Sequence, residues 1–182
     1  MTVAELDALP PSRAAPLLES CCGSDEWVRH MLARRPFGSM DALLHAADDV
    51  WWSLGPSDWR EAFAHHPRIG ERGAAHAQSA RAQAWSADEQ RGAATSDDAL
   101  RSALAEGNRE YEQRFGYIYI VCATGRSAAE MLALLRERLE NDPATELRLA
   151  AGEQAKITRL RLLKLLGAPA PGVAARTADR PS

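Results

Sequence analysis

The sequence predicts an all-α protein, a single-domain helical bundle with one extended buried segment near residues 117–123. Three observations support this prediction. Apolar residues recur every three to four positions through most of the chain, as they do on the buried face of an amphipathic helix. Capping residues and prolines bracket those stretches. Only one short run, YIYIVCA, has the composition of a β-strand, and no second run is present to pair with it.

One domain accounts for the length and composition of the chain. The 182 residues are 46% hydrophobic and 26% charged, which supplies enough apolar material for one core. No internal repeat or long linker separates two domains. We assign residues 1–167 to the helical domain and residues 168–182, which are rich in proline and alanine, to a disordered tail.

Three short amphipathic helices are expected in the N-terminal part. The first opens at Ser24, a favourable N-cap followed by acidic residues, and stops before Pro36. The second covers residues 39–55, where leucine, valine and tryptophan recur at helical spacing. The third begins at Ser57 and stops before Pro67, because proline disfavours the α conformation of the residue that precedes it.

In the middle of the chain, the sequence predicts secondary structure poorly for residues 70–84 and clearly for residues 96–116. Residues 70–84 are rich in alanine, arginine, glutamine and glycine and lack a clear apolar face. We expect a mobile loop there, although the alanines would also permit a helix. Residues 96–116 predict a long helix with Leu100, Leu104 and Tyr111 on one face.

Two further helices follow the extended segment. Ser127 and Glu130 have the spacing of a capping box and mark the start of the first. Asp142 as N-cap, Pro143 at the first helical position and Gly167 as a stop define the second.

Charge and cysteine content exclude several classes of protein. The net charge of −3 gives no reason to expect nucleic acid or an anionic membrane as a partner. No apolar run reaches the roughly 18 residues of a membrane span, and no signal-peptide pattern opens the chain. Cys21 and Cys22 are adjacent and Cys122 is distant, so neither a disulfide framework nor a Cys-x-x-Cys zinc site is expected. We expect a soluble cytoplasmic protein.

A histidine pair before a proline is the first candidate functional feature. His65 and His66 would point about 100° apart on a helix, so they cannot share a site unless the helix ends there. Pro67 predicts that end and places His66 on a stiff corner. A helix C-terminus would raise the pKa of His66. Taken alone, the pattern favours a surface histidine at a helix end over a catalytic one.

Metal binding is the remaining alternative for the histidines. His45, His65, His66 and His76 are the candidate ligands, but no His-Glu-x-x-His spacing links them. We expect no metal site.

The motif WSADEQ at residues 85–90 has two interpretations. Ser86 and Glu89 have the spacing of a capping box, which is the favoured structural interpretation. A helix N-terminus also presents free N–H groups, so a substrate carboxylate could bind there.

Two arginines near the end of the domain, Arg159 and Arg161, are alternative candidates for one residue of the functional site. Arg159 and Arg161 diverge by about 200° around a helix. Arg161 lies between Leu160 and Leu162, and an arginine buried there needs a partner because an unpaired buried charge is costly. A protein carboxylate and a substrate carboxylate are both open as that partner.

Four blocks together resemble a known family. HPRIGE at 66–71, WSADEQ at 85–90, YEQRFGYIYIVCATGRSAAEML at 111–132 and NDPATEL…KITRLRL at 141–162 are similar to the 2-oxo-4-hydroxy-4-carboxy-5-ureidoimidazoline (OHCU) decarboxylases of urate breakdown. The blocks occur in the family's order from about Trp51 to Leu166. Between the first two blocks, the alanine-rich stretch GERGAAHA departs from the family by lacking lysines.

The resemblance implies a fold, an activity and a set of site residues. It implies an all-helical, cofactor-independent homodimer that converts its small-molecule substrate into (S)-allantoin and carbon dioxide. His66 matches the catalytic histidine, with Glu89 assisting. The matched substrate-binding residues are Pro67, Ser86, Gln90, Tyr119, Ile120, Val121, Cys122, Ala123 and Arg161.

Two alternatives of other classes remain at this point. One is a non-catalytic helical module that binds a partner through apolar helix faces. The other is a metal-dependent hydrolase that uses the histidines.

Overall fold

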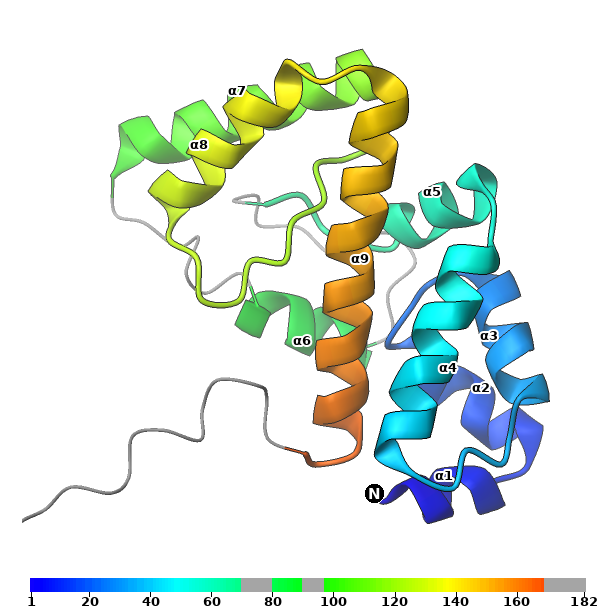
Figure 1. Ribbon diagram of the computed structural model, residues 1–182. Helices are drawn as coiled ribbons and strands as arrows, with labels where there is room; N and C mark the ends of the chain where they lie inside the picture. Colours follow the sequence, from blue (N-terminus) through cyan, green and yellow to red (C-terminus); the bar gives the residue numbers. More distant parts are fainter. Residues whose placement is uncertain (70–79, 90–96, 169–182) are drawn as a thin grey trace, which may run out of the picture.

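The computed structural model describes residues 1–69, 80–89 and 97–168, and this part of the chain is helical without a β-strand (Figure 1). The all-α prediction is confirmed. The helices are α1 (Val3–Ala8), α2 (Pro11–Glu19), α3 (Asp25–Ala33), α4 (Met40–Ser53), α5 (Pro56–Ala64), α6 (Ala80–Glu89), α7 (Asp98–Phe115), α8 (Ala128–Leu139) and α9 (Pro143–Leu165). None of them is long and apolar enough to cross a membrane.

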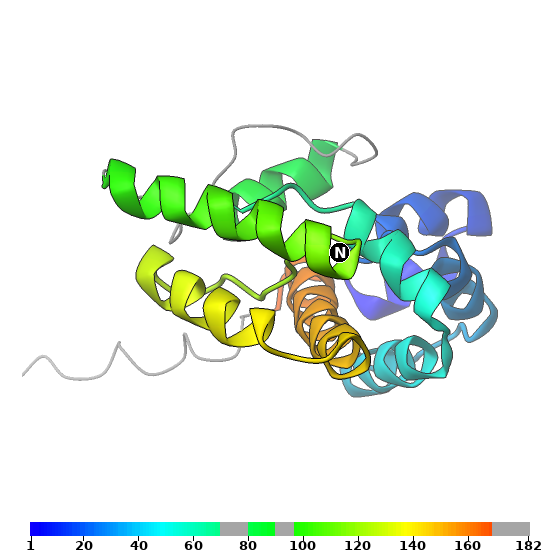
Figure 2. The same cartoon turned by 90° about the horizontal axis from the view of Figure 1, so that it is seen from above.

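Helix α9 lies between two groups of helices and packs against both sides of the fold. Seen from above, α7 and α8 lie side by side on one side of α9, and α3, α4 and α5 lie on the other (Figure 2). The indole Nε1 of Trp51 on α4 donates a 2.9 Å hydrogen bond to the Ala151 carbonyl of α9. Ala150 and Ala151 are fully buried, so small side chains allow the close approach of α4 to α9.

The local signals that begin and end helices act as predicted. The Ser24 side chain accepts a hydrogen bond from the Trp27 amide at the start of α3. Ser127 and Glu130 form a capping box at the start of α8. Asp142 caps α9, and Gly167 adopts a left-handed φ of 67° just after it.

The prediction missed two helices and displaced the start of a third. Helices α1 and α2 are too short, at 6 and 9 residues, to show a clear period. A capping box of Thr2 and Glu5 opens α1 and is the signal that could have revealed it. Helix α5 begins at Pro56 rather than Ser57, because Asp58 accepts a hydrogen bond from the Gly55 amide.

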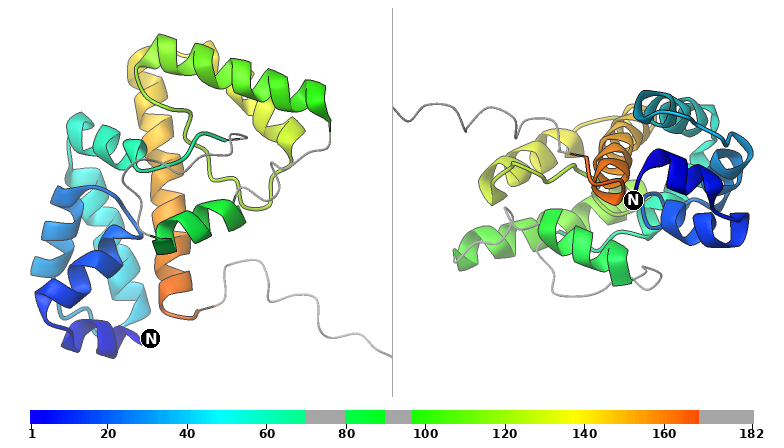
Figure 3. Two further views of the ribbon diagram at one scale, coloured as in Figure 1. Left: turned by 180° about the vertical axis from the view of Figure 1, so that it is seen from behind. Right: turned by 90° about the horizontal axis from the view of Figure 1, so that it is seen from below.

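The region expected as a mobile loop is in part helical. Residues 80–84 belong to α6, and residues 70–79 lie outside the described part of the chain. Seen from behind, α6 crosses the lower half of α9 (Figure 3). The proposed tail also lies outside the described part from residue 169 onward.

A drawn-out segment joins α7 to α8 and passes α9. Residues 117–123 contain no regular secondary structure, and Tyr119, Ile120 and Val121 are buried. The positive φ of 77° at Gly116 ends α7 and turns the chain into this segment.

Candidate active site

The predicted helix end at the histidine–proline corner is present. Helix α5 ends at Ala64, and the His66 amide still donates to the Phe63 carbonyl at 3.0 Å. Pro67 then directs the chain away from the helix axis. The corner places the partly buried His66 and Pro67 in the wall of a pocket.

The two histidines have different surroundings. The His65 Nδ1 atom lies 3.0 Å from the Glu61 carbonyl, within its own helix. The His65 ring also packs so closely on Gly23 that a Cβ there would lie 2.4 Å from its Cγ. His65 is therefore a packing residue, and His66 is the histidine of the pocket.

The pocket gathers residues from the α5 corner, α6, the segment after α7, and α9. Its empty volume, mouth included, is about 390 Å³. Its lining residues are His66, Pro67, Ile69, Ser86, Glu89, Tyr119, Ile120, Val121, Cys122, Ala123, Thr124 and Ile157.

A buried ion pair supports one wall of the pocket. Arg161 on α9, 3% exposed, donates to both carboxylate oxygens of Glu89 at 3.1 and 2.9 Å. Its Nη2 also donates to the Ser86 hydroxyl at 2.9 Å. Bidentate pairing of this kind fixes the carboxylate in one orientation. The partner of Arg161 is thus a protein carboxylate that itself faces the pocket.

The choice between the two arginines follows from their exposure. The Arg159 side chain is 48% exposed and lies 3.7 Å from Asp48 on the outer surface. Arg161 points inward and is the arginine associated with the site. Gln90, the remaining predicted binding residue, lies outside the described residues.

The capping-box interpretation of Ser86 and Glu89 is wrong. Helix α6 begins at Ala80, so Ser86 lies in its second half and Glu89 is its last residue. The alanine-rich stretch before Ser86 already continues the helix, and Ser86 bonds Arg161 across the fold. The second interpretation, an anion-binding helix N-terminus at this motif, is therefore excluded as well.

The predicted rise in the pKa of His66 is also wrong. Burial and the positive charge of Arg161 lower the pKa of His66 to about 3, while Gln154 acts in the opposite direction. These effects outweigh the favourable field of the helix C-terminus. His66 is therefore neutral at neutral pH, and its imidazole is a proton acceptor.

Sequence reasoning missed pocket residues contributed by apolar side chains. Ile157 lies one turn before Arg161 on α9, so the i, i+4 spacing was an available signal. Ile69 follows the His-Pro corner within the HPRIGE block. Thr124 directly follows the predicted segment.

Metal ligands do not cluster in the part of the chain that the structure describes. No group of three or more histidine, cysteine, aspartate or glutamate side chains is arranged to hold an ion there. Burial raises the pKa of Cys21 and of Cys22 to about 12, so both thiols are protonated. His76 lies outside the described residues.

The fold and the pocket define a class of protein before any comparison. A neutral histidine and a fixed carboxylate that line the same pocket are suited to proton transfer on a small polar molecule. The sequence profile of the OHCU decarboxylase family matches residues 7–163. The chain belongs to this family.

Individual relatives and solved structures are similar over most of the chain. The Uric acid degradation bifunctional protein TTL of Arabidopsis thaliana is 42% identical over 146 residues, which are 80% of this chain and 45% of that protein. The mouse (Mus musculus) OHCU decarboxylase is 32% identical over 140 residues, which are 75% of this chain and 76% of that protein. The matched part of the chain thus spans less than half of the plant relative.

The described fold is also similar to solved structures. A crystal structure of OHCU decarboxylase in the presence of (S)-allantoin has a TM-score of 0.71 and 40% identity, over 82% of this chain and 96% of that chain. A crystal structure of (S)-allantoin synthase, 18% identical with a TM-score of 0.66, shares the fold.

Proposed function

We propose that this protein decarboxylates 2-oxo-4-hydroxy-4-carboxy-5-ureidoimidazoline to (S)-allantoin and carbon dioxide. The observation that carries the proposal is the neutral His66 facing the same pocket as the Glu89–Arg161 pair. Family membership and the (S)-allantoin named with a 40% identical structure support the same substrate.

The reaction needs no electron sink beyond the substrate itself. When the bond to the carboxylate breaks, its electron pair moves toward the neighbouring C=N bond, and the nitrogen takes up a proton. The product of this step is an enol. Loss of the enol hydroxyl proton and protonation of the adjacent ring carbon then give allantoin. The stereochemistry depends on adding that last proton to one face only.

His66 suits the proton transfers in this sequence. His66 is neutral at the start and can therefore accept the hydroxyl proton, and its lowered pKa makes it a weaker base than a free imidazole. The imidazolium formed in this environment is a strong acid, which favours prompt release of the proton. Glu89, held by Arg161, lies at the same pocket to orient the substrate hydroxyl.

The segment of Tyr119, Ile120, Val121, Cys122 and Ala123 is proposed to hold the substrate ring through those of its main-chain groups that other residues do not already bond. A segment without regular secondary structure leaves such groups available, whereas a helix would use them internally. Pro67, Ser86, Gln90 and Arg161 complete the proposed binding residues. We also propose a homodimer in the cytoplasm.

A coupled assay tests the function directly. Urate oxidase and the hydrolase that follows it generate the unstable substrate in place, and circular dichroism follows the optical activity of the allantoin formed. We expect faster decay of the intermediate and strong enrichment in the (S) form. Racemic allantoin formed at the uncatalysed rate would refute the proposal and favour the non-catalytic helical module.

A second arm of the assay separates the metal-dependent hydrolase. After exhaustive treatment with EDTA and removal of the chelator, the decarboxylase should retain full activity. Loss of activity that is restored by a divalent ion would instead favour metal chemistry.

A further inference from the structure

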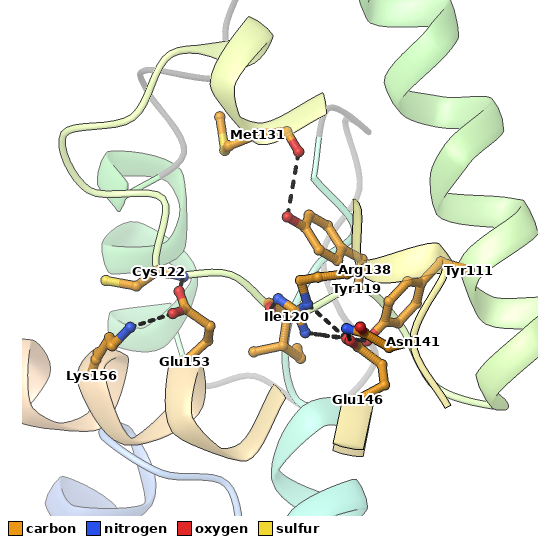
Figure 4. Close-up of polar contacts among 10 residues, drawn as sticks. All are labelled: Tyr111, Tyr119, Ile120, Cys122, Met131, Arg138, Asn141, Glu146, Glu153 and Lys156. Carbon is orange, nitrogen blue, oxygen red and sulfur yellow. Dashed lines mark hydrogen bonds and ion pairs between the residues drawn. The ribbon is translucent and has the colours of Figure 1, made fainter. Parts of the chain in front are cut away.

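We propose that Glu153, together with Arg138, is a positioning residue that holds the 117–123 segment so that the main chain of Val121 faces the ligand. This inference rests on the proposed function, because it concerns how the same pocket holds the substrate ring. Figure 4 shows both side chains reaching the segment from the helices beside it.

Three side-chain hydrogen bonds hold alternate residues of the segment. Arg138 on α8 donates through Nη1 to the Ile120 carbonyl at 2.6 Å. Glu153 on α9 accepts from the Cys122 amide at 2.7 Å. Arg126 donates through Nε to the Cys122 carbonyl at 3.2 Å. Together these bonds use the Ile120 carbonyl and both main-chain groups of Cys122.

The alternation determines which main-chain groups remain available. In extended backbone, residues two apart present their N–H and C=O groups to the same edge, and the residue between presents its own to the opposite edge. The bonds to Ile120 and Cys122 therefore assign Val121 to the other edge. The Val121 amide and carbonyl have no hydrogen-bond partner within the described chain. Val121 lines the pocket, and it also borders a second cavity that Arg138 and Glu153 line.

The side chains of Arg138, Glu153 and Arg126 thus bond one edge of the segment, as a neighbouring strand would in a sheet. The opposite edge, at Val121, is left without such bonds. Buried main-chain groups without partners are costly, so the open edge is stabilised by a ligand that pairs with it. A cyclic urea or amide fits, because it presents a donor and an acceptor side by side. The ring of (S)-allantoin has this chemistry.

Each anchor is itself held in place. Arg138 donates through Nε to Glu146 at 2.7 Å and through Nη2 to the Tyr111 hydroxyl at 3.3 Å. Glu146 is fully buried, so the guanidinium cannot turn away without breaking a buried ion pair. Burial acts to raise the pKa of Glu153, but Lys156 and the Cys122 amide together lower it below its ordinary value. Glu153 is therefore an anion and a strong acceptor.

Three variants separate the positioning bond from the neighbouring ion pair. Glu153→Ala removes the acceptor of the Cys122 amide. Glu153→Gln keeps an oxygen that can accept from the same amide but loses the charge. Lys156→Ala removes the exposed partner of Glu153 and leaves the Cys122 bond in place.

The measurements are KM and kcat in the coupled assay, the Kd of (S)-allantoin by calorimetry, and the thermal midpoint. For Glu153→Ala we expect KM and Kd to rise about tenfold or more, the fold-change that corresponds to losing a hydrogen bond to a charged group. The pH profile should not change, because His66 is untouched. Glu153→Gln and Lys156→Ala should stay within about threefold of the wild type.

Two outcomes would overturn the inference. One is a Glu153→Ala protein with KM and Kd within twofold of the wild type. The other is a rise in KM and Kd in Glu153→Gln and in Lys156→Ala as large as that in Glu153→Ala. This result would assign the effect to the Glu153–Lys156 ion pair. If Glu153→Ala does not fold, Glu153→Asp replaces it, because the shorter side chain withdraws the carboxylate from the Cys122 amide. A wild-type protein that binds (S)-allantoin but fails the coupled assay would refute the proposed function alone.

Discussion

At the scale of single residues, the adjacent histidines provide a matched pair. Replacing His66 with asparagine removes the proton acceptor of the pocket, and we expect the stereospecific decarboxylation to fall about 100-fold or more. His65→Asn should stay within about threefold, because His65 bonds its own helix and packs on Gly23. Turnover in the coupled assay and far-UV circular dichroism check both variants. An inactive His65→Asn beside an active His66→Asn would reverse the assignment.

Glu89 is expected to matter for both turnover and stability. Glu89→Gln should lower turnover about 100-fold, because a negative charge oriented toward the substrate is lost. It should also lower the free energy of unfolding by about 2 kcal/mol, because the buried Arg161 loses its counter-charge. Urea denaturation and the coupled assay measure the two effects.

Asp88→Asn is the control for Glu89→Gln. Asp88 precedes Glu89 on α6 but is 48% exposed, and it pairs with Lys164 at 3.1 Å. Surface pairs of this kind contribute little, so both turnover and stability should be unchanged. Near-normal turnover in Glu89→Gln with reduced stability would assign Glu89 a purely structural role.

At the scale of elements, the Arg138–Glu146 pair links α8 to α9 behind the pocket. Arg138→Met should lower the free energy of unfolding by about 3–5 kcal/mol, because it leaves the fully buried Glu146 without a counter-charge. Arg68→Met is the control, since its pair with Glu112 is exposed and contributes less than about 1 kcal/mol. Urea denaturation of both variants provides the measurement. Equal losses in the two would show that burial of the pair is unimportant.

The double variant completes the test of this link. Glu146→Met in the Arg138→Met background should recover part of the lost stability, because removing both charges also removes the desolvation cost. Failure to recover would locate the loss in the Ile120 and Tyr111 contacts of Arg138 instead.

The elements that sequence predicted best are those with local signals. Ser24, Ser127 and Asp142 cap the helices that they were expected to cap, because a capping bond spans only two or three residues. Pro67 predicted the helix end at His66, whereas the place of His66 in a site was expected only from the family resemblance. The 117–123 segment also departs from helix as its composition indicated.

The errors arose where distant contacts decide the outcome. Ser86 and Glu89 have the local spacing of a capping box, but their partner Arg161 lies more than 70 residues away. The pKa of His66 likewise depends on burial and on Arg161, which no local pattern reveals. The anchors of the extended segment, Arg138 and Glu153, were missed for the same reason.

At the scale of the whole molecule, stability should depend on pH through His66. Its pKa is about 3 in the folded protein and near 6.5 in the unfolded chain, so the unfolded chain binds more protons between these values. The contribution to stability is present above about pH 6.5 and is lost progressively as the pH falls toward 3. Urea denaturation at about pH 7.5 and about pH 5 measures this loss.

His66→Asn is the control for the pH dependence. Without the imidazole, the variant should lose less stability than the wild type between the two pH values. An identical loss of stability in both proteins would show that His66 has the same protonation state at pH 5 in the folded and the unfolded protein. It would contradict the prediction. The pH dependence of the rate should differ from that of an enzyme with an ordinary catalytic histidine. When the pH is lowered through 6.5, kcat/KM should not fall, because His66 stays neutral.

The position of Arg161 on α9 has a consequence for the synthesis of the chain. The ribosome makes Ser86 and Glu89 early, and Arg161 follows Glu89 by 72 residues. A domain generally folds as a unit, so its packing waits for the elements that are synthesised last. Throughout that interval the nascent chain carries a carboxylate without its buried cation, and α9 has not yet emerged to close the pocket. The pocket wall that Ser86, Glu89 and Arg161 form can therefore be completed only after α9 has been synthesised.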